Sequence, residues 1–243
     1  MIDVVPFSSL GRFDNEWLSA RYHFSFADYH DHERTGIGPL LVWNDDAIQP
    51  GTGFGRHGHR DMEIITYVRE GAVSHEDHLG NRGRTVAGDV QVMSAGKGIL
   101  HAEYNHEPGV TRIYQIWIRP DRAGLAPRWD TRRFPKAEKA GELVVLASGR
   151  PADAGTGALH INQDAALLAA TLKAGQTVRH AFEPGRVSYL VTARGRVSVN
   201  GVEMGERDGA VIRGEPAVVI EALEESEVLL TDLPDLPGET RAA

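Results

Sequence analysis

The chain contains no cysteine among its 243 residues. Disulfide bonds and thiolate metal ligands are therefore excluded, and any metal site has to be built from imidazole and carboxylate groups. No apolar run approaches the roughly 20 residues that a membrane-spanning helix needs, so we expect no membrane association. The first eleven residues lack the basic stretch and apolar run of a secretory signal, which favours a cytoplasmic location.

Basic charge is also scarce. The chain has 26 lysine and arginine residues against 34 aspartate and glutamate residues, a formal net charge of -8 at pH 7. Proteins that bind nucleic acids usually carry a basic stripe that neutralises phosphates, whereas the arginines here are scattered among acidic residues. We therefore expect no direct nucleic-acid partner.

Glycine-rich turns separate short β-branched and aromatic runs throughout the chain, which predicts an all-β sandwich or barrel. Gly80-Asn81 and Asn200-Gly201 are hairpin signals, because these residue types tolerate a positive φ. The runs that we expect to form strands include residues 63–68, 114–118, 190–192, 196–199, 218–221 and 227–231.

The chain divides into two halves of similar pattern. Residues 130–141 are polar, contain Pro135 and resemble a linker, so we predict domains at residues 1–134 and 135–243. Residues 162–171 favour a helix that Asn162 caps, with a short pair of strands as the alternative. We expect the tail after Leu233 to be frayed.

Two histidine-containing segments carry the strongest chemical signal. His57 and His59 lie two apart, which places both imidazoles on one face of a strand. His101 and Glu103 repeat this spacing directly after a glycine-rich turn. A single His-x-His is more often an ordinary strand feature than a metal site. Two such pairs can surround one divalent cation and leave coordination positions open for catalysis, and they suit Fe(II), Mn, Ni, Cu or Zn. Glu63 has the spacing to share the face of His57 and His59.

These segments resemble the paired motifs of the cupin superfamily, and the fuller pattern resembles the pirin family. The resemblance covers most of residues 20–120 and is looser in the second half, where it rests on strand order and on residues 229–234. The matching segments are residues 23–29, 44–46, 53–54, 57–64, 66–68, 80–81, 88–91, 93–96 and 98–103.

The resemblance implies a bicupin, that is, two stacked β-barrel (jelly-roll) domains with one metal in the first. It implies that His57, His59, His101 and Glu103 are the metal ligands. Glu63 is then not a ligand but a candidate to orient a ligand imidazole. Many pirins have proline where this chain has Gly58, a difference that leaves the ligand spacing unchanged.

The remaining histidines lack ligand spacing, and we expect them to be ordinary surface or core residues. We expect His75, His78 and His106 beside turns, and His30 and His32 in a charged loop, to be exposed. His160 and His180 are isolated, which predicts a second half without metal.

The resemblance implies quercetin 2,3-dioxygenase activity: O₂ opens a flavonol ring and carbon monoxide is released. Fe(II) is the preferred cofactor, Glu103 the candidate general base, and a small, flat, flavonol-like aromatic the expected substrate. One alternative is a metal-dependent regulator that binds a protein partner, as some pirins do. Another is a different cupin reaction, such as sugar isomerisation or oxalate breakdown.

Overall fold

The computed structural model describes residues 1–134 and 140–236. Its elements are almost all strands, with two 3₁₀ turns, η1 (Phe7–Ser9) and η3 (Pro151–Asp153), and no α-helix in the described part of the chain. The strands formed by residues 1–134 are β1 (Ile2–Val5), which joins a sheet of the second half, and, in the first half, β2 (Gly11–Asp14), β3 (Leu18–Tyr22), β4 (Leu40–Ile48), β5 (Gly53–His59), β6 (Glu63–Glu70), β7 (Ala72–Asp77), β8 (Arg82–Val86), β9 (Val90–Ser94), β10 (Ile99–Tyr104), β11 (Thr111–Ile118) and β12 (Arg128–Arg132). Those of the second half are β13 (Val144–Ser148), β14 (Leu159–His160), β15 (Ala166–Leu172), β16 (Thr177–Ala181), β17 (Arg186–Arg194), β18 (Val197–Val199), β19 (Val202–Met204), β20 (Gly209–Arg213), β21 (Ala217–Ala222) and β22 (Ser226–Pro234).

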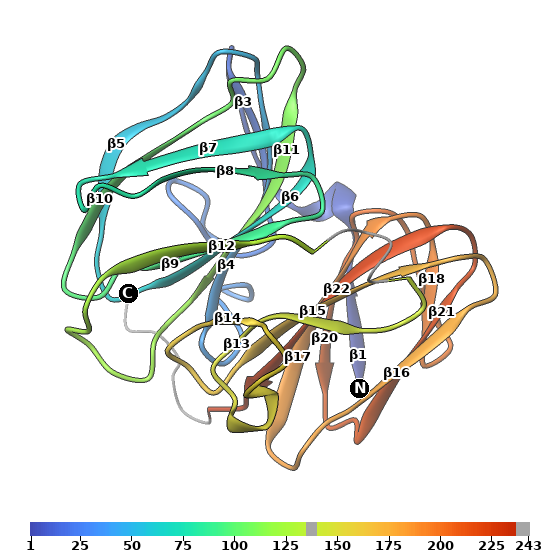
Figure 1. The fold of residues 1–243 in the computed structure, drawn as a ribbon. Helices are drawn as coiled ribbons and strands as arrows, with labels where there is room; N and C mark the ends of the chain where they lie inside the picture. Colours follow the sequence, from blue (N-terminus) through green and yellow to red (C-terminus); the bar gives the residue numbers. More distant parts are fainter. Residues whose placement is uncertain (135–139, 237–243) are drawn as a thin grey trace.

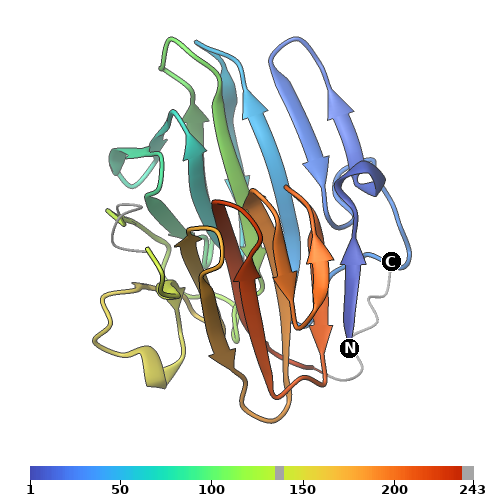
Figure 2. The same cartoon turned by 90° about the vertical axis from the view of Figure 1, so that its right-hand side faces the viewer.

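Each half is built from one seven-stranded and one four-stranded sheet (Figure 1). The first half has the orders β12-β9-β6-β11-β4-β3-β2 and β5-β10-β7-β8. The second half has the orders β1-β20-β17-β22-β15-β13-β14 and β16-β21-β18-β19. In Figure 2 the blue-to-green strands lie above the orange-to-red ones, except for the dark-blue β1, which lies beside the orange strands. The predicted all-β class with two stacked barrels is confirmed.

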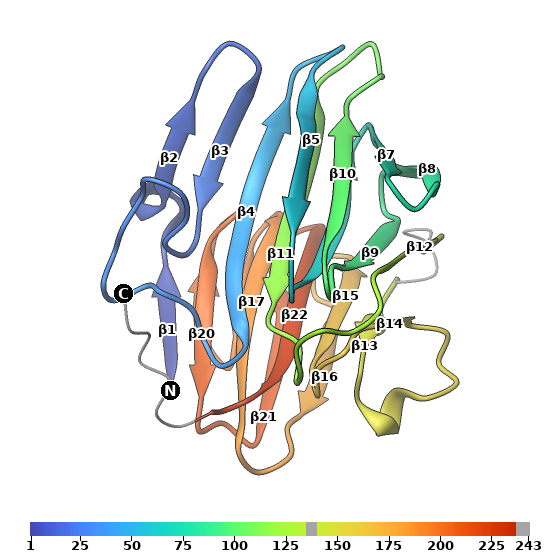
Figure 3. The same ribbon diagram turned by 90° about the vertical axis from the view of Figure 1, so that its left-hand side faces the viewer.

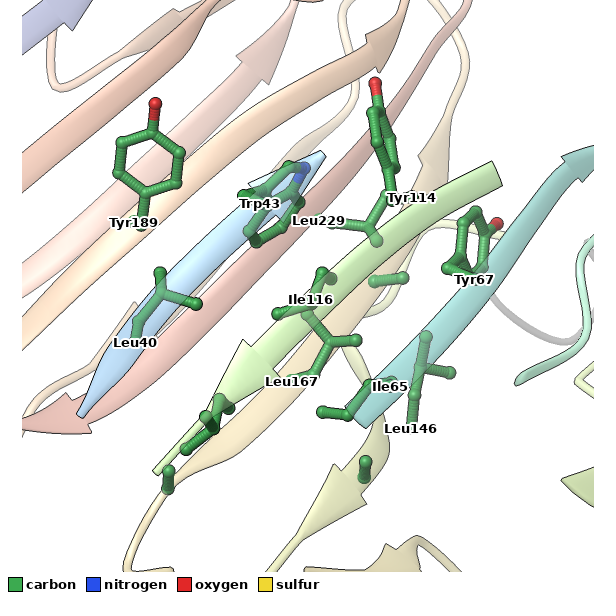
Figure 4. Packing of buried hydrophobic residues seen from close by; sticks show 14 of the residues in the cluster. Leu40, Trp43, Ile65, Tyr67, Tyr114, Ile116, Leu146, Leu167, Tyr189 and Leu229 are labelled. Carbon is green, nitrogen blue, oxygen red and sulfur yellow. The ribbon is translucent and has the colours of Figure 1, made fainter. Parts of the chain in front are cut away.

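The two seven-stranded sheets face each other across the largest apolar core (Figure 4). Side chains alternate along a strand, so β11 directs Tyr114 and Ile116 toward the second half and Gln115 toward the interior of the first barrel. Tyr189 and Leu229 meet this face from β17 and β22. One layer of shared side chains therefore fixes the barrel that carries the histidines against its neighbour.

The boundary between the halves is crossed by the first strand. β1 pairs with β20, with Ile2 opposite Ile212, so the start of the chain extends the sheet of the second half (Figure 3). Residue 135, where we predicted the domain boundary, lies outside the described residues, and that division stays a prediction.

Part of the predicted linker is ordered sheet. β12 pairs with β9, with Trp129 opposite Met93, and Phe134 is buried in the shared core. The linker prediction was therefore wrong for residues 130–132. Trp129 and Phe134, the apolar residues that flank residues 130–133, hold this polar stretch against the first barrel.

The helix predicted at residues 162–171 was wrong. β15 lies between β13 and β22, and every residue from Ala166 to Ala170 is buried. A strand covered on both faces loses the alternating pattern, so its apolar run resembles a helix in sequence. The strand pair that we held as the alternative is one continuous strand. Of the predicted frayed tail, Pro234 still belongs to β22, and residues 237–243 lie outside the described part.

The predicted hairpins at Gly80-Asn81 and Asn200-Gly201 are confirmed. They connect β7 with β8 and β18 with β19. Asn200 and Gly201 both have positive φ, as a two-residue hairpin of this kind requires. Within the described residues, no helix is long and apolar enough to cross a bilayer.

Candidate metal centre

The register of the four-stranded sheet gathers the histidines on one face. Strand β10 lies between β5 and β7 (Figure 3), and His101 on β10 is opposite His57 of β5 and opposite Asp77 of β7. Two residues further along β10, Glu103 lies opposite His75. Residues directly opposite in an antiparallel ladder project to the same face. Three adjacent strands thus direct their ligand-type side chains to the inner face of the sheet.

Three imidazoles converge to the geometry of a metal site. The ligand nitrogens of His57, His59 and His101 all lie within 4.8 Å of one another. The Nε2 atoms of His57 and His101 are 3.1 Å apart. Metal–nitrogen bonds of about 2.0–2.1 Å place neighbouring ligand nitrogens about 3 Å apart, so this pair fits a shared divalent cation.

The local backbone of β5 orients His57. Nδ1 of His57 lies 2.7 Å from the carbonyl oxygen of Gly55, so the ring donates there and directs the Nε2 lone pair inward. The ladder shifts register at this place, since Glu103 pairs with Phe54 rather than with Gly55. The resulting bulge positions the carbonyl oxygen of Gly55 to fix the tautomer of His57.

Glu103 lies at the buried end of the cluster. Its Oε1 accepts hydrogen bonds from Gln91 Nε2 at 2.6 Å and from Thr66 Oγ1 at 3.4 Å, and its Oε2 accepts one from Gln115 Nε2 at 2.7 Å. Burial raises the pKa of Glu103 to about 7, although these three hydrogen bonds act in the opposite direction. The donors favour a carboxylate that keeps a lone pair for a metal.

The orientation of the two glutamine amides follows from the hydrogen bonds behind them. Trp117 Nε1 donates to Oε1 of Gln115 at 2.9 Å, and Thr85 Oγ1 donates to Oε1 of Gln91 at 3.1 Å. Each amide oxygen is thus occupied, so each amide nitrogen faces Glu103. A network of neutral side chains therefore holds one buried carboxylate in place.

Burial favours the neutral form of His59 and His101. Together with a smaller effect of the neighbouring His57, it lowers the pKa of His59 to about 4 and that of His101 to about 2. Metal ions bind imidazole in its neutral form. The centre is therefore prepared for a cation at neutral pH without first losing protons from these two rings.

A second cluster shares His101. His75, His101 and Glu103 also place one ligand atom each within 4.8 Å of one another, and all three are buried. The structure thus groups His101 with His57 and His59 in one cluster and with His75 and Glu103 in the other. The four-ligand set of His57, His59, His101 and Glu103 stays a prediction.

Sequence reasoning missed His75, which we expected to be exposed beside a turn. It lies within β7 and its side chain is fully buried. The spacing of His75 and Asp77 is the same alternate-residue pattern that identified His57 and His59, and it would have found this residue. The donors to Glu103 gave no comparable signal, since isolated Gln and Thr residues are common in strands.

Glu63 lies on a different face. Its Oε2 accepts a hydrogen bond from Ser94 Oγ at 2.7 Å, and its Oε1 accepts one from Asn162 Nδ2 at 3.0 Å. Thr66, which contacts Glu103, occupies the opposite face of β6. The structure places the buried Glu63 between the two halves and does not bring it to the imidazoles.

Aromatic side chains flank the open side of the cluster. His57 and His59 are only half-buried, whereas His101 and Glu103 are buried. The ring of Trp117 contacts His59 edge-on with centroids 4.9 Å apart. The cluster is therefore closed at the Glu103 end and accessible beside an aromatic surface.

The histidines outside the two clusters differ in their exposure and contacts. The predicted exposure of His30, His32, His78 and His106 is confirmed. In the second half His160 is exposed, while Nε2 of His180 lies 2.8 Å from Asp232 Oδ2. Both candidate metal clusters found among the described residues lie in the first half.

Comparison with known proteins places both halves in one family. Residues 5–118 match the family described as Pirin, and residues 145–233 match the quercetinase C-terminal cupin domain. A pirin-like protein of Caulobacter vibrioides is 57% identical over 232 residues, which cover 96% of this chain and 99% of that protein. A protein of Escherichia coli named quercetin 2,3-dioxygenase is 44% identical over 228 residues, covering 92% of this chain and 95% of that protein.

Solved structures agree with the sequence comparison. The crystal structure of the bacterial pirin YhhW from Escherichia coli in complex with nickel(II) is 40% identical to this chain. The superposition has a TM-score of 0.90 and covers 97% of this chain and 100% of that one. Since close relatives match along nearly their full length, the chain belongs to the pirin family.

Proposed function

We propose that the protein is a metal-dependent dioxygenase that opens the ring of a flavonol with O₂ and releases carbon monoxide. The observation that carries this proposal is the convergence of three imidazoles beside a buried carboxylate on the inner face of one sheet. The name of the Escherichia coli relative supports the reaction, and the nickel in the related pirin supports a metal at such a site.

The proposed ligands are His57, His59, His101 and Glu103. A divalent cation held there supplies Lewis acidity, which favours the flavonolate over the flavonol. Fe(II) is the cation that we propose first, and Mn, Ni, Cu and Zn also suit three imidazoles with one carboxylate.

Glu103 is the proposed general base. It lies at the closed end of the cluster, and Gln91 and Gln115 fix its two oxygens from behind. A carboxylate held this way can accept the proton of the 3-hydroxyl group without changing its own position. The glutamines then serve to keep the base oriented.

Aromatic surface beside His59 suits a flat substrate. Phe26 and Trp117 meet edge-on with centroids 5.4 Å apart, and Trp117 in turn contacts His59. Aromatic rings of a small flavonol-like compound can pack there and exclude water from the electron-rich ring. In the overall reaction both atoms of O₂ enter the ester product, and carbon 3 leaves with its own oxygen as carbon monoxide.

The experiment is the loss of quercetin absorbance in air, with carbon monoxide measured in parallel. The protein is loaded separately with Fe(II), Mn(II), Ni(II) and Cu(II), and His101→Ala is the matched control. We expect one carbon monoxide per quercetin consumed with at least one metal, and none with the variant. Stoichiometric metal loading without turnover would contradict the proposal and would favour a regulatory role with a protein partner.

A further inference from the structure

Three side chains on the inner face of the four-stranded sheet form a line that ends at the proposed metal site. Asp77 Oδ2 lies 3.1 Å from Nε2 of His75. Nδ1 of His75 lies 3.4 Å from Nδ1 of His101. On the far side of that ring, Nε2 of His101 faces Nε2 of His57 at 3.1 Å. Each imidazole thus uses both of its nitrogens.

The first member of this line is surrounded by donors. Oδ1 of Asp77 accepts hydrogen bonds from the backbone N–H groups of Leu79 at 2.9 Å and Asn81 at 3.1 Å. Its Oδ2 accepts one from the side-chain amide of Asn81 at 2.8 Å. A carboxylate in such a setting only accepts hydrogen bonds, so the Nε2 of His75 has to be the donor.

The direction of the first hydrogen bond determines the next one. A neutral imidazole carries one proton, so a His75 that donates from Nε2 has a lone pair at Nδ1. The opposing Nδ1 of His101 then has to carry the proton between the two rings. His101 is left with its lone pair at Nε2, on the side where His57 and His59 lie.

The ring of His75 is fixed in this orientation. The side chains of His75 and Asp77 are fully buried. Trp129 stacks on His75 with an interplanar angle of 8° and centroids 4.8 Å apart. A Cβ atom at Gly83 would lie 2.2 Å from the Trp129 ring, so the glycine makes room for the stack. The imidazole cannot turn over without displacing its neighbours.

We propose that Asp77 and His75 are positioning residues that hold His101 in the tautomer with its proton on Nδ1 and its Nε2 lone pair directed at the cation. This inference rests on the proposed metal site, of which His101 is the central ligand. Groups that orient a ligand imidazole typically change metal affinity 10- to 100-fold when they are removed.

The substitution Asp77→Asn should reverse which atom donates and which accepts in each hydrogen bond from residue 77 to His101. The amide has one oxygen, which the two backbone donors of Leu79 and Asn81 retain. Its NH₂ group then faces His75 Nε2 and the side-chain amide of Asn81, which turns over to present its oxygen. His75 therefore has to accept at Nε2 and donate from Nδ1. His101 in turn has to accept at Nδ1 and carry its proton on Nε2, where it blocks the metal position.

The direct test is the tautomer of each histidine in the metal-free protein, measured by two-bond ¹H–¹⁵N correlation with ¹⁵N-labelled histidine. We expect the proton of His101 on Nδ1 and that of His75 on Nε2, and both reversed in Asp77→Asn. Glu76→Gln is the matched control, because it removes one charge from the exposed face of the same strand and should leave both tautomers unchanged. A wild-type His101 with its proton on Nε2 would overturn the inference, whether or not any variant folds.

A nickel titration by calorimetry separates this role from a general structural one. We expect Asp77→Asn to weaken Ni(II) binding 10- to 100-fold in the wild-type background and less than about twofold when His75 is already leucine. An equal loss in both backgrounds would mean that Asp77 only supports its turn, and it would overturn the inference. Failure of the wild-type protein to bind nickel would instead contradict the proposed function, since the tautomers are read without metal.

Discussion

The amide nitrogen of Gln115 lies 2.7 Å from Oε2 of Glu103, and Trp117 holds that amide from behind through its indole N–H. The carboxylate proposed as ligand and base therefore depends on a neutral side chain that touches no metal. Two strands contribute to this arrangement, β11 for Gln115 and β10 for Glu103. Its consequence can be tested at Gln115.

We predict that Gln115→Leu weakens Ni(II) binding by about 10- to 100-fold, because Glu103 loses a donor that holds it as an oriented carboxylate. Isothermal titration calorimetry measures the change. Gln49→Leu, at an exposed position, is the control and should bind as the wild type does. Equal affinities in the two variants would show that the network does not support the site.

Metal should also stabilise the fold. Binding to the folded state alone adds about 2.7 kcal/mol when free metal is 100 times the dissociation constant. For a chain of this size that corresponds to a rise in melting temperature of roughly 5–10 °C. Differential scanning fluorimetry with and without Ni(II) gives the shift, and His101→Ala should abolish it. A shift that persists in His101→Ala would place the metal elsewhere.

The segments of the candidate metal centre could be found from sequence, because alternate residues of a strand project to one face. His57, His59, His101 and Glu103 were identified in this way before any pairing was known. The pairing itself was not readable, and it is the register of β10 against β7 that brings His75 and Asp77 to the same face. A one-residue change in register would have turned both side chains away.

The helix predicted at residues 162–171 failed for a related reason. The apolar residues of β15 are buried by the second four-stranded sheet on one face and by the first half on the other. No periodicity marks such a strand, so composition alone decided for a helix. Burial between the two halves depends on residues that are distant in the sequence, so the sequence of a short segment cannot reveal it.

A buried hydrogen bond between the two halves should contribute to the free energy of unfolding. Nδ1 of His23 lies 2.9 Å from the phenol oxygen of Tyr189, and both side chains are buried. Tyr189→Phe leaves that nitrogen without a partner, which should lower the free energy of unfolding by about 1–3 kcal/mol. Urea denaturation measures it. Tyr104→Phe, at a half-buried ring stacked on His106, should cost less than about 0.5 kcal/mol, and equal costs would contradict the prediction.

His23 should make stability depend on pH. Burial lowers its pKa to about 3, whereas an unfolded histidine titrates near 6.5. Between these values the unfolded state binds the additional proton, so the free energy of unfolding falls as the pH drops below about 6.5. We predict that His23→Gln flattens this dependence by up to about 1.4 kcal/mol per pH unit. Urea denaturation from pH 7 to pH 4.5 tests it, with the exposed His160→Gln as control, and identical slopes in the two variants would be inconsistent with a neutral buried His23.

The most direct test of the metal centre is anomalous diffraction at the nickel absorption edge from crystals of the loaded protein. We predict one anomalous peak bonded to Nε2 of His57, to His59, to Nε2 of His101 and to a carboxylate oxygen of Glu103, with His75 hydrogen-bonded behind His101. A peak on exposed histidines such as His30 or His106, or one in which His75 replaces His57 and His59 as ligand, would contradict the site on which the proposed reaction depends.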